Sequence, residues 1–297
     1  MSVEHTLVLT GPDNYYIKLL GFVAGIIILS IFCFIDDLKG IPPYVKLIGQ
    51  ILAAVVVTYS GVKIDKVLAS SIGGVITNNT LSFFITVIWI VGITNAINLI
   101  DGLDGLSSGV SLISCVSLLI IFSLNSSPLI SIILITALAG SLLGFIPFNF
   151  HPAKTFIGDT GANFLGYSLS IISILGVAKT YTAIVLIAPL IIFALPLLDT
   201  AFAIIRRIFK TKSFSGVFKA DKEHFHHKII RHGYSQKQAV FILYGISASF
   251  GMFAIILLES GIYKAISFAL MIFAIATIGY KDIVTLGKEL KNKDEIK

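Results

Sequence analysis

Long apolar segments alternate with short polar stretches along the whole chain. Nine such segments lie near residues 15–35, 44–60, 81–100, 106–124, 129–147, 161–178, 182–205, 238–258 and 262–280. A helix that crosses a bilayer needs about 20 consecutive apolar residues, and each segment approaches this length. The pattern therefore predicts an all-α fold, a polytopic membrane helical bundle with about nine transmembrane helices.

The same pattern indicates one integral-membrane domain over residues 1–297. The longest polar interruption, 206–237, is predicted to be a loop, and 281–297 is predicted to be a basic tail. The stretch 61–80 alternates briefly and is compatible with a small surface hairpin. The first residues lack the basic start and apolar core of a cleavable signal peptide, so none is expected.

The composition agrees with a membrane protein. The chain is 56% hydrophobic and only 13% charged, whereas an ordinary soluble domain is about one quarter charged. The two cysteines, Cys33 and Cys115, lie in apolar segments without metal-type spacing. Both are therefore predicted to be inert core thiols.

Positive charge is unevenly distributed once the nine segments are made to alternate sides. The loops and tail on one side carry 17 of the 22 Lys and Arg residues. Such an excess marks the cytoplasmic side of a membrane protein. We therefore expect a multi-pass protein of the plasma (inner) membrane, with its N-terminus outside and its C-terminus in the cytoplasm. Nucleic acid is not an expected partner.

Two adjacent acids, Asp36 and Asp37, end the first apolar segment in "FCFIDDLKG". A solvated helix end would explain such a pair, because adjacent acids are common at surfaces. Acids at a helix C-terminus nevertheless oppose the helix dipole, by about 0.3 kcal/mol or more. The pair therefore needs a counter-ion, and either Lys39 or a metal ion would serve.

A second polar cluster, "NAINLIDGLDGL", follows the third apolar segment. Asn95, Asn98, Asp101 and Asp104 recur at every third position, so on a helix they would share one broad face. Capping of a helix end explains one or two of these residues. Four polar groups beside the hydrocarbon are costly and indicate a functional site.

The third cluster is "PFNFHPAKTFIGDTGA", with Asn149, His151, Lys154 and Asp159 in one short loop. Asp159 is a candidate N-cap of the next helix, and a helix N-terminus beside an acid also suits a phosphate and a metal ion. Phe156 is predicted either to pack in the core or to offer a stacking face.

The fourth cluster, "DKEHFHH", contains His224, His226 and His227, half of the six histidines in the chain. A zinc site is one alternative, but zinc favours a closed Cys/His set and neither cysteine is nearby. A surface loop with chance histidines is another. A cationic, hydrogen-bonding patch for a pyrophosphate is the more economical interpretation.

All four clusters fall on the predicted cytoplasmic side. Hard carboxylate oxygens with incomplete coordination suit Mg²⁺, which shares phosphate oxygens and keeps water ligands. Lysines and histidines suit the remaining phosphate charge. Together they predict phosphoryl transfer between a soluble diphosphate and a lipid phosphate.

The motifs "IDDLKG", "NAINLIDGLDGL", "FNFHPAKTFIGDTGA" and "DKEHFHHKII" resemble, in order, the four cytoplasmic motifs of the polyprenyl-phosphate N-acetylhexosamine-1-phosphate transferases. This family, glycosyltransferase family 4, includes the phospho-MurNAc-pentapeptide translocases. The resemblance runs from about residue 20 to 245. It implies transfer of a sugar 1-phosphate from a UDP-sugar to undecaprenyl phosphate, with release of UMP and initiation of a cell-envelope glycopolymer. The implied cofactor is Mg²⁺, with Mn²⁺ as an alternative.

The resemblance also implies roles for individual residues. The implied catalytic residues are Asp36, Asp37, Asp101, Asp104, His226 and His227. The implied metal ligands are Asp159 and Asp101. The implied substrate-binding residues are Lys39, Lys46, Asn95, Asn98, Asp104, Phe156, Arg206, Arg207 and His224, with Asp104 and Phe156 at the uracil.

The spaced form "HFHH" and the pair Arg206-Arg207 resemble the N-acetylglucosamine branch, whereas the pentapeptide translocases carry consecutive histidines. UDP-N-acetylglucosamine is therefore the expected donor, and a related UDP-N-acetylhexosamine is the alternative. The family has ten or eleven spans, so the chain is expected to lack N-terminal helices. A homodimer is expected by the resemblance alone.

Two other functions remain as alternatives. A transporter would place ionisable residues near the bilayer centre, whereas here they gather at one rim. A truncated, non-catalytic relative that binds lipid or partners would keep the fold without the activity.

Overall fold

The computed structural model describes residues 14–64, 79–177, 183–212 and 224–272. The predicted basic tail, the predicted hairpin, the end of the ninth apolar segment and the middle of the loop 206–237 lie outside these residues. The described helices are α2 (Tyr15–Lys39), α3 (Pro43–Tyr59), α5 (Asn79–Ile100), α6 (Leu106–Leu124), α7 (Leu129–Asn149), α8 (Gly158–Val177), α9 (Ala183–Ile192), α10 (Ala194–Thr211), α11 (Phe225–Arg231) and α12 (Gln236–Ser260), followed by a short helix at Ile262–Ile272.

The predicted fold class is confirmed. Every predicted apolar segment coincides with helix where the structure describes it, and the described residues contain no β-strand. Among the described residues, five helices are long and apolar enough to cross a membrane, namely α2, α5, α6, α7 and α12. The helix α3 and the helix at Ile262–Ile272 are apolar but shorter.

One helix prediction is wrong, because the segment 182–205 is two helices rather than one. The helices α9 and α10 meet at Phe193, whose φ and ψ of −87° and 10° are not those of a regular helix. Pro196, in the first turn of α10, has no N–H to bond to the preceding turn, which is a sufficient cause of a break. The Phe193 ring is fully buried and meets the ring of Trp89 edge-on, with 6.5 Å between the centroids.

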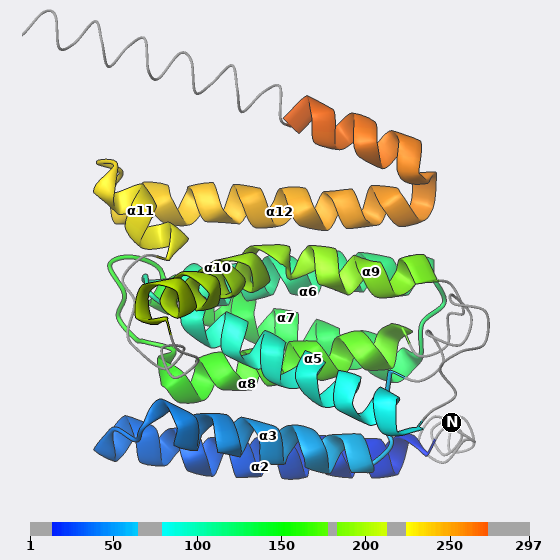
Figure 1. The fold of residues 1–297 in the computed structure, drawn as a ribbon. Helices are drawn as coiled ribbons and strands as arrows, with labels where there is room; N and C mark the ends of the chain where they lie inside the picture. The colour runs from blue at the N-terminus through cyan, green and yellow to red at the C-terminus, as the bar shows by residue number, and fades with distance from the viewer. Residues whose placement is uncertain (1–13, 65–78, 178–182, 213–223, 273–297) are drawn as a thin grey trace, which may run out of the picture.

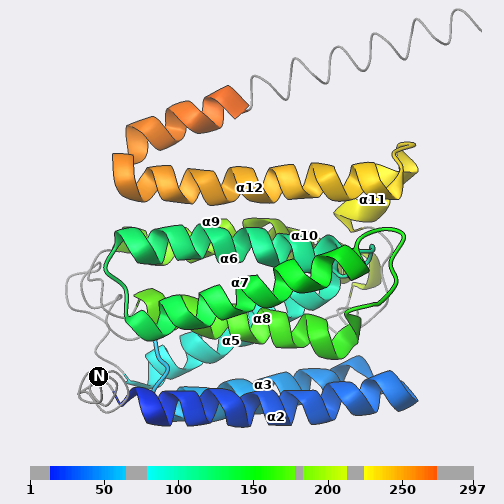
Figure 2. The ribbon, with the colours of Figure 1, turned by 180° about the vertical axis from the view of Figure 1, so that it is seen from behind.

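The helices lie side by side along a common direction (Figure 1). The pair α2–α3 forms one edge of the bundle and packs against α5 and α8, whereas α12 forms the opposite edge and packs against α6 and α9. The view from behind shows α7 beside α6 and α8 (Figure 2).

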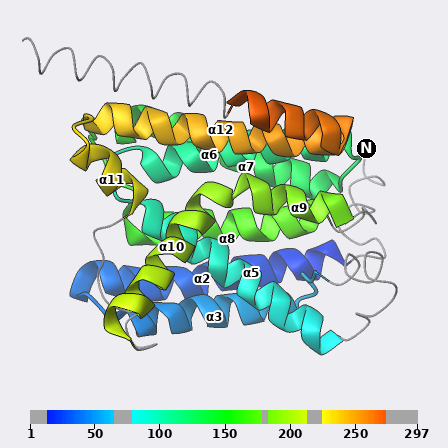
Figure 3. The ribbon, with the colours of Figure 1, turned by 45° about the horizontal axis from the view of Figure 1, so that its top comes forward.

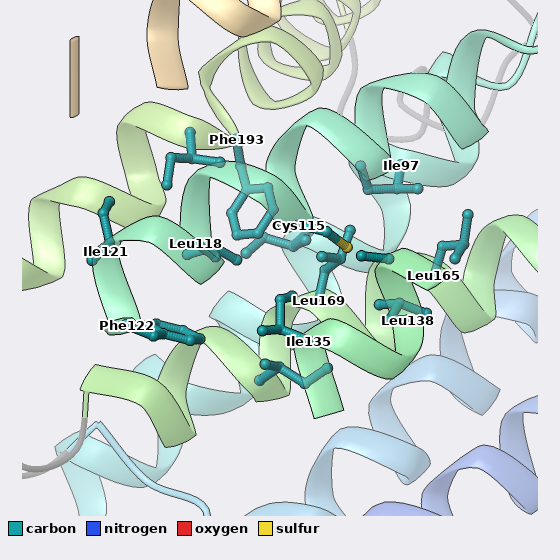
Figure 4. Packing of buried hydrophobic residues seen from close by; sticks show 14 of the residues in the cluster. Ile97, Cys115, Leu118, Ile121, Phe122, Ile135, Leu138, Leu165, Leu169 and Phe193 are labelled. Atoms are coloured by element: carbon teal, nitrogen blue, oxygen red, sulfur yellow. The ribbon is translucent and has the colours of Figure 1, made fainter. Parts of the chain in front are cut away.

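The centre of the bundle is built around α6. In its most apolar 18-residue window, 67% of the residues are buried, against 22% for α2. The helix α2 therefore presents most of its apolar side chains outward, as lipid-facing helices do, and α6 presents them to other helices. The largest core cluster joins Leu118 and Phe122 of α6 to Leu169 of α8 and to Phe193 (Figure 4).

The four sequence motifs gather at one end of the bundle. The end of α2, the starts of α3 and α8, and the helix α11 all lie at the left in Figure 1, opposite the end marked N, and Figure 3 shows the same grouping. The connection "GIPP" between α2 and α3 is short because Gly40 takes a positive φ of 65° and Pro43 opens α3. Glycine adopts such a φ without strain, and proline suits the first helical position.

Candidate active site

An ammonium group lies between two carboxylates where α2, α3 and α8 meet. Lys46 Nζ is 2.5 Å from Asp36 Oδ2 and 2.5 Å from Asp159 Oδ2. Their side chains are 18%, 10% and 39% exposed, so solvent reaches all three. The two acids are 123 residues apart in sequence, and the fold alone brings them to one cation. We call these residues the acidic cluster.

Further hydrogen bonds fix the remaining oxygens of the acidic cluster. The Ile41 backbone N–H donates to Asp36 Oδ1 at 2.8 Å, and Asn98 Nδ2 donates to Asp159 Oδ1 at 2.7 Å. Asp159 lies in the first turn of α8, where the helix dipole favours a negative charge. Its side chain accepts hydrogen bonds from Lys46 and Asn98, so it belongs to the cluster.

Asp37 is joined to the same helix by a separate contact. Thr160 Oγ1 donates a hydrogen bond of 2.6 Å to Asp37 Oδ2. Both members of the acidic pair predicted from the sequence therefore face the start of α8, one through Lys46 and the other through Thr160.

A buried chain of amide side chains supports the acidic cluster from inside the bundle. Asn95 donates to Gln50, Gln50 Nε2 donates to Asn163 Oδ1 at 2.6 Å, and Asn163 Nδ2 donates to the Asp159 carbonyl at 2.8 Å. Gln50 and Asn163 are 1% and 0% exposed. Buried amides are costly unless they are paired, so this chain locks α3, α5 and α8 together beneath the site. Asn95 belongs to this support.

The loop between α5 and α6 carries the next two predicted acids. Ser107 Oγ donates to Asp101 Oδ1 at 2.7 Å. Burial, together with the charges of Asp159 and Asp104, raises the pKa of Asp101 to about 6, and the Ser107 hydrogen bond opposes this shift. The effect of Asp159 shows that Asp101 and the acidic cluster share one electrostatic environment.

Asp104 is held by the loop that follows α7. His151 Nδ1 lies 2.8 Å from Asp104 Oδ2, and the Ala153 N–H donates to the same oxygen at 3.2 Å. The side chain of Asn149 accepts from Ser108 and donates to a carbonyl of the same loop. These contacts fix the two loops relative to one another.

A pocket of about 310 Å³ opens between these loops. Its lining residues are Asp101, Gly102, Leu103, Asp104, Asn149, Phe156, Ile157 and Gln236. Phe156 is 74% exposed, so its ring offers an open face and does not pack in the core. The pocket thus combines an aromatic face with carboxylates and amides, which is the lining expected for a polar, planar ligand.

The histidine motif packs against Gly102, on the loop between α5 and α6 that lines the pocket. His224 and His226 are 5% and 2% exposed, and their rings are parallel, 5.9 Å apart. The ring of His227 follows at 4.2 Å from that of His226. His224 Nδ1 lies 2.9 Å from Oδ2 of Asp199, a buried acid of α10.

Burial and, to a smaller extent, the neighbouring His227 lower the pKa of His226 to about 4. His226 is therefore neutral near pH 7 and adds no charge to the cationic patch predicted from the sequence. Its Nε2 instead lies against Gly102, where an added Cβ would be only 2.2 Å away. The motif thus buttresses the pocket at this point.

The predicted basic residues are more dispersed. Lys39 is exposed at the last residue of α2, and Arg206 and Arg207 are partly buried on α10. The predicted role of the two arginines in donor binding remains a prediction.

Sequence reasoning missed several supporting residues. Gln50 and Asn163 interrupt apolar segments, and Asp199 is an acid inside the seventh segment. An ionisable or amide side chain at such a place is itself a signal of function, and that signal was available from the sequence. Ser107 and Gln236 carried no comparable signal, because serine and glutamine are common at helix starts.

Together, the fold and the site define a class of protein: a polytopic membrane bundle with an acidic, nucleotide-sized site at one end. Residues 19–177 match the model of glycosyl transferase family 4. The chain is 38% identical over 258 residues to a probable undecaprenyl-phosphate N-acetylglucosaminyl 1-phosphate transferase of Bacillus subtilis, with 86% of this chain and 71% of that protein covered. The chain therefore belongs to glycosyl transferase family 4, as its motifs predicted.

Two further relatives bear on the branch. A decaprenyl-phosphate N-acetylglucosaminephosphotransferase of Mycobacterium leprae is 33% identical over 75% of this chain, which spans 60% of that protein's length. A phospho-N-acetylmuramoyl-pentapeptide-transferase of Halalkalibacterium halodurans is 34% identical, but over 41% of this chain and 34% of that protein. Similarity to the N-acetylglucosamine enzymes is thus more extensive.

Proposed function

We propose that this protein transfers N-acetylglucosamine 1-phosphate from UDP-N-acetylglucosamine to undecaprenyl phosphate and releases UMP. A phosphate oxygen of the lipid attacks the β-phosphorus of the donor, and the bond from that phosphorus to the oxygen shared with the α-phosphate breaks. The product is a pyrophosphate-linked lipid sugar, which would initiate a cell-envelope glycopolymer. The names of the most similar relatives support the donor sugar and the polyprenyl acceptor.

The observation that carries the proposal is the convergence of Asp36 and Asp159 on Lys46 beside the pocket. Phosphoryl transfer requires little covalent chemistry from the protein, because positioning and electrostatic stabilisation supply most of the rate enhancement. A partly exposed ammonium that two carboxylates orient can turn to a phosphate oxygen, because it then exchanges one anionic partner for another.

The acids have an electrostatic role in this proposal. A phosphate monoester already carries a charge of about −1.5 to −2 near neutral pH, so the acceptor needs little help from a base. Both oxygens of Asp36 accept hydrogen bonds, from Ile41 and Lys46. This geometry fits a role of Asp36 in orienting Lys46 better than a role as the base that takes a proton from the lipid phosphate.

The oxygen donors fit a magnesium ion. The described residues contain no group of three or more His, Cys, Asp and Glu side chains that would hold a metal by themselves. Mg²⁺, however, is usually bound by only one or two carboxylates, with substrate phosphates and water completing its shell. Asp159 is one such carboxylate, and Asp101, whose pKa the charge of Asp159 raises, is the second ligand that the motifs implied. When bound, the ion would neutralise phosphate oxygens; Mn²⁺ is the alternative ion.

The pocket suits the uridine end of the donor. Phe156 offers the face on which a pyrimidine ring can stack, and Asp104 is held in place to accept hydrogen bonds from its edge. A volume of about 310 Å³ is at the lower end of the range for small-molecule sites. The diphosphate would then extend toward the acidic cluster.

The proposed orientation follows from the uneven positive charge. In the sequence, the loops and the tail on the side of the four motifs carry 17 of the 22 Lys and Arg residues, and such an excess supports a cytoplasmic position for the site. UDP-sugars are hydrophilic and would reach the site from that side.

The test is UMP release from the purified chain with UDP-N-acetylglucosamine, undecaprenyl phosphate and Mg²⁺. We expect release to require all three and to fall about 10²–10³-fold in Asp159→Asn, as when one oriented electrostatic group is lost. Glu259→Gln is the matched control, because it neutralises an exposed acid of α12 far from the site. Full activity in Asp159→Asn would show that the acidic cluster does not take part in the reaction.

The same assay separates the alternatives. Turnover of UDP-MurNAc-pentapeptide in preference to UDP-N-acetylglucosamine would move the chain to the pentapeptide branch. Binding of undecaprenyl phosphate without any UMP release would favour the non-catalytic alternative, and solute uptake into vesicles without UMP would favour a transporter.

A further inference from the structure

Asp199 is a buried acid in a helix of a membrane bundle, and the proposed reaction leaves it unexplained. It lies on α10, one turn after Pro196, and it is 3% exposed. Buried carboxylates in membrane helices are expensive and are retained where they pair with a specific partner. Both oxygens of Asp199 have such partners.

Both partners belong to the first residues of the histidine motif. His224 Nδ1 lies 2.9 Å from Oδ2, and the backbone N–H of Phe225 donates to Oδ1 at 2.9 Å. His224 is the N-cap residue of α11, and its own side chain makes no capping hydrogen bond. The carboxylate of Asp199 therefore supplies the cap from another helix, and it fixes the backbone and the ring together.

The contact also determines which ring nitrogen carries the proton. An ionised carboxylate can only accept hydrogen bonds, so the Nδ1 atom of His224 must be the donor. The Nε2 atom is then left as the exchangeable position, as in other carboxylate–histidine pairs. A neutral His224 in this arrangement is the Nδ1–H tautomer.

The orientation of His224 is passed on to the pocket by direct contact. The His224 ring lies parallel to that of His226, and His226 Nε2 packs against Gly102 of the pocket wall. Both rings are buried, so the surrounding side chains confine their orientation. The contacts run from α10 through α11 to the loop between α5 and α6.

We propose that Asp199 is a positioning residue of the active site: it fixes the tautomer of His224 and, through His224 and His226, the position of the Gly102 loop. It does not contact the substrates. The role rests on the proposed transferase function, but the tautomer itself can be measured without substrates.

The first measurement is the histidine tautomer, from ¹⁵N NMR of the full chain in detergent micelles near neutral pH. The signal of His224 is assigned by its absence in His224→Asn. We expect the Nδ1–H form of His224, or the doubly protonated ring. The Nε2–H form in the unmodified chain would overturn the proposal, whether or not the chain releases UMP.

The second measurement is a double-mutant cycle on UMP release. We expect Asp199→Asn to lower kcat about 10–100-fold, because a small displacement of the pocket wall misplaces the reacting groups, with KM for both substrates nearly unchanged. If Asp199 acts through His224, Asp199→Asn adds little to the loss in a His224→Asn background. Two outcomes would show a merely structural role. One is a double variant whose loss of kcat is the product of the two single losses. The other is the expected loss of kcat in Asp199→Asn while His224 keeps its Nδ1–H form.

Failure of the proposed function has a different signature. In that case the unmodified chain releases no UMP with any donor, while the tautomer still decides whether Asp199 orients His224.

Discussion

The acidic cluster and the Asp199–His224 pair use the same chemistry in opposite surroundings. In each, a carboxylate faces a nitrogen base that the fold brings from another helix. The acids of the cluster are 10% and 39% exposed, whereas the side chains of Asp199 and His224 are 4% and 7% exposed. An exposed pair contributes little to stability and can exchange partners, whereas breaking a buried pair leaves an uncompensated polar group.

The comparison therefore assigns the chemical role to the acidic cluster and the structural role to the Asp199–His224 pair. The cluster is accessible enough for phosphate oxygens to replace a carboxylate at Lys46. The Asp199–His224 pair is inaccessible, and it serves by keeping its geometry. We expect substitutions in the first to reduce activity and substitutions in the second to reduce stability as well.

The largest effect on stability is expected for Asp199→Ala. It leaves the Nδ1–H of His224 and the N–H of Phe225 without a partner, and each buried unpaired donor costs about 1–3 kcal/mol. We expect the free energy of unfolding to fall by about 2–5 kcal/mol. Thermal unfolding can be followed by the fluorescence of Trp89, the only tryptophan. An unfolding temperature equal to that of the unmodified chain would contradict the burial argument.

Lys46→Met should show the opposite pattern. Loss of the shared ammonium is expected to lower the rate of UMP release about 10²–10³-fold, while the free energy of unfolding falls less than in Asp199→Ala, because water reaches the carboxylates that remain. Lys46→Arg is the informative control, because it keeps the charge but not the compact geometry of an ammonium. A large loss of stability in Lys46→Met would mean that the acidic cluster stabilises the fold and does not take part in phosphoryl transfer.

Gly102→Ala tests the contact between the two regions. The added Cβ would lie 2.2 Å from His226 Nε2, so the ring or the loop must shift. Overpacking of this kind typically costs about 1–3 kcal/mol, and we expect a weaker affinity for the UDP-sugar. Gly92→Ala is the matched control, because nothing lies within 4 Å of the added Cβ there. If the two variants have the same stability and the same affinity for the UDP-sugar, His226 does not support the pocket wall.

The smallest effect is expected in the pH dependence of stability. Burial raises the pKa of Asp101 to about 6 from its usual 3.8, so the folded state binds a proton more tightly than the unfolded state. The ionised form therefore destabilises the fold above pH 6, and this cost disappears as the pH falls through 6 toward 4. Asp101→Asn should be more stable than the unmodified chain at pH 7–8, with a difference that shrinks below pH 6. Melting curves of both chains across this range, without added metal, provide the measurement.

Much of the fold follows from the sequence because membrane spans are fixed by length and apolarity. The starts and ends of α6 and α7 lie within two residues of the predicted ones. The break at Phe193 was not predicted, because proline is tolerated in many membrane helices and only the packing decides where the chain bends.

The site was predictable in its members but not in its contacts. Asp36, Asn98 and Asp159 could be selected because polar residues at the membrane rim are costly. That Lys46 bridges two acids, and that His226 is buried and neutral, depends on long-range packing between helices that the spacing of residues does not encode. Asp199 was overlooked although an acid within an apolar segment is a signal of function, because the prediction rested on clusters of polar residues and Asp199 stands alone in its segment.

The break at Phe193 affects how freely the sequence can vary. Because Pro196 has no N–H, its hydrogen bond to the preceding turn is missing at this junction, and α9 and α10 need not share one straight axis. Substitutions that re-seat α9 in a bilayer of different thickness need not rotate Asp199 away from His224. Adaptation to new lipids can therefore accumulate in α9 while the geometry at the far end of the bundle is preserved.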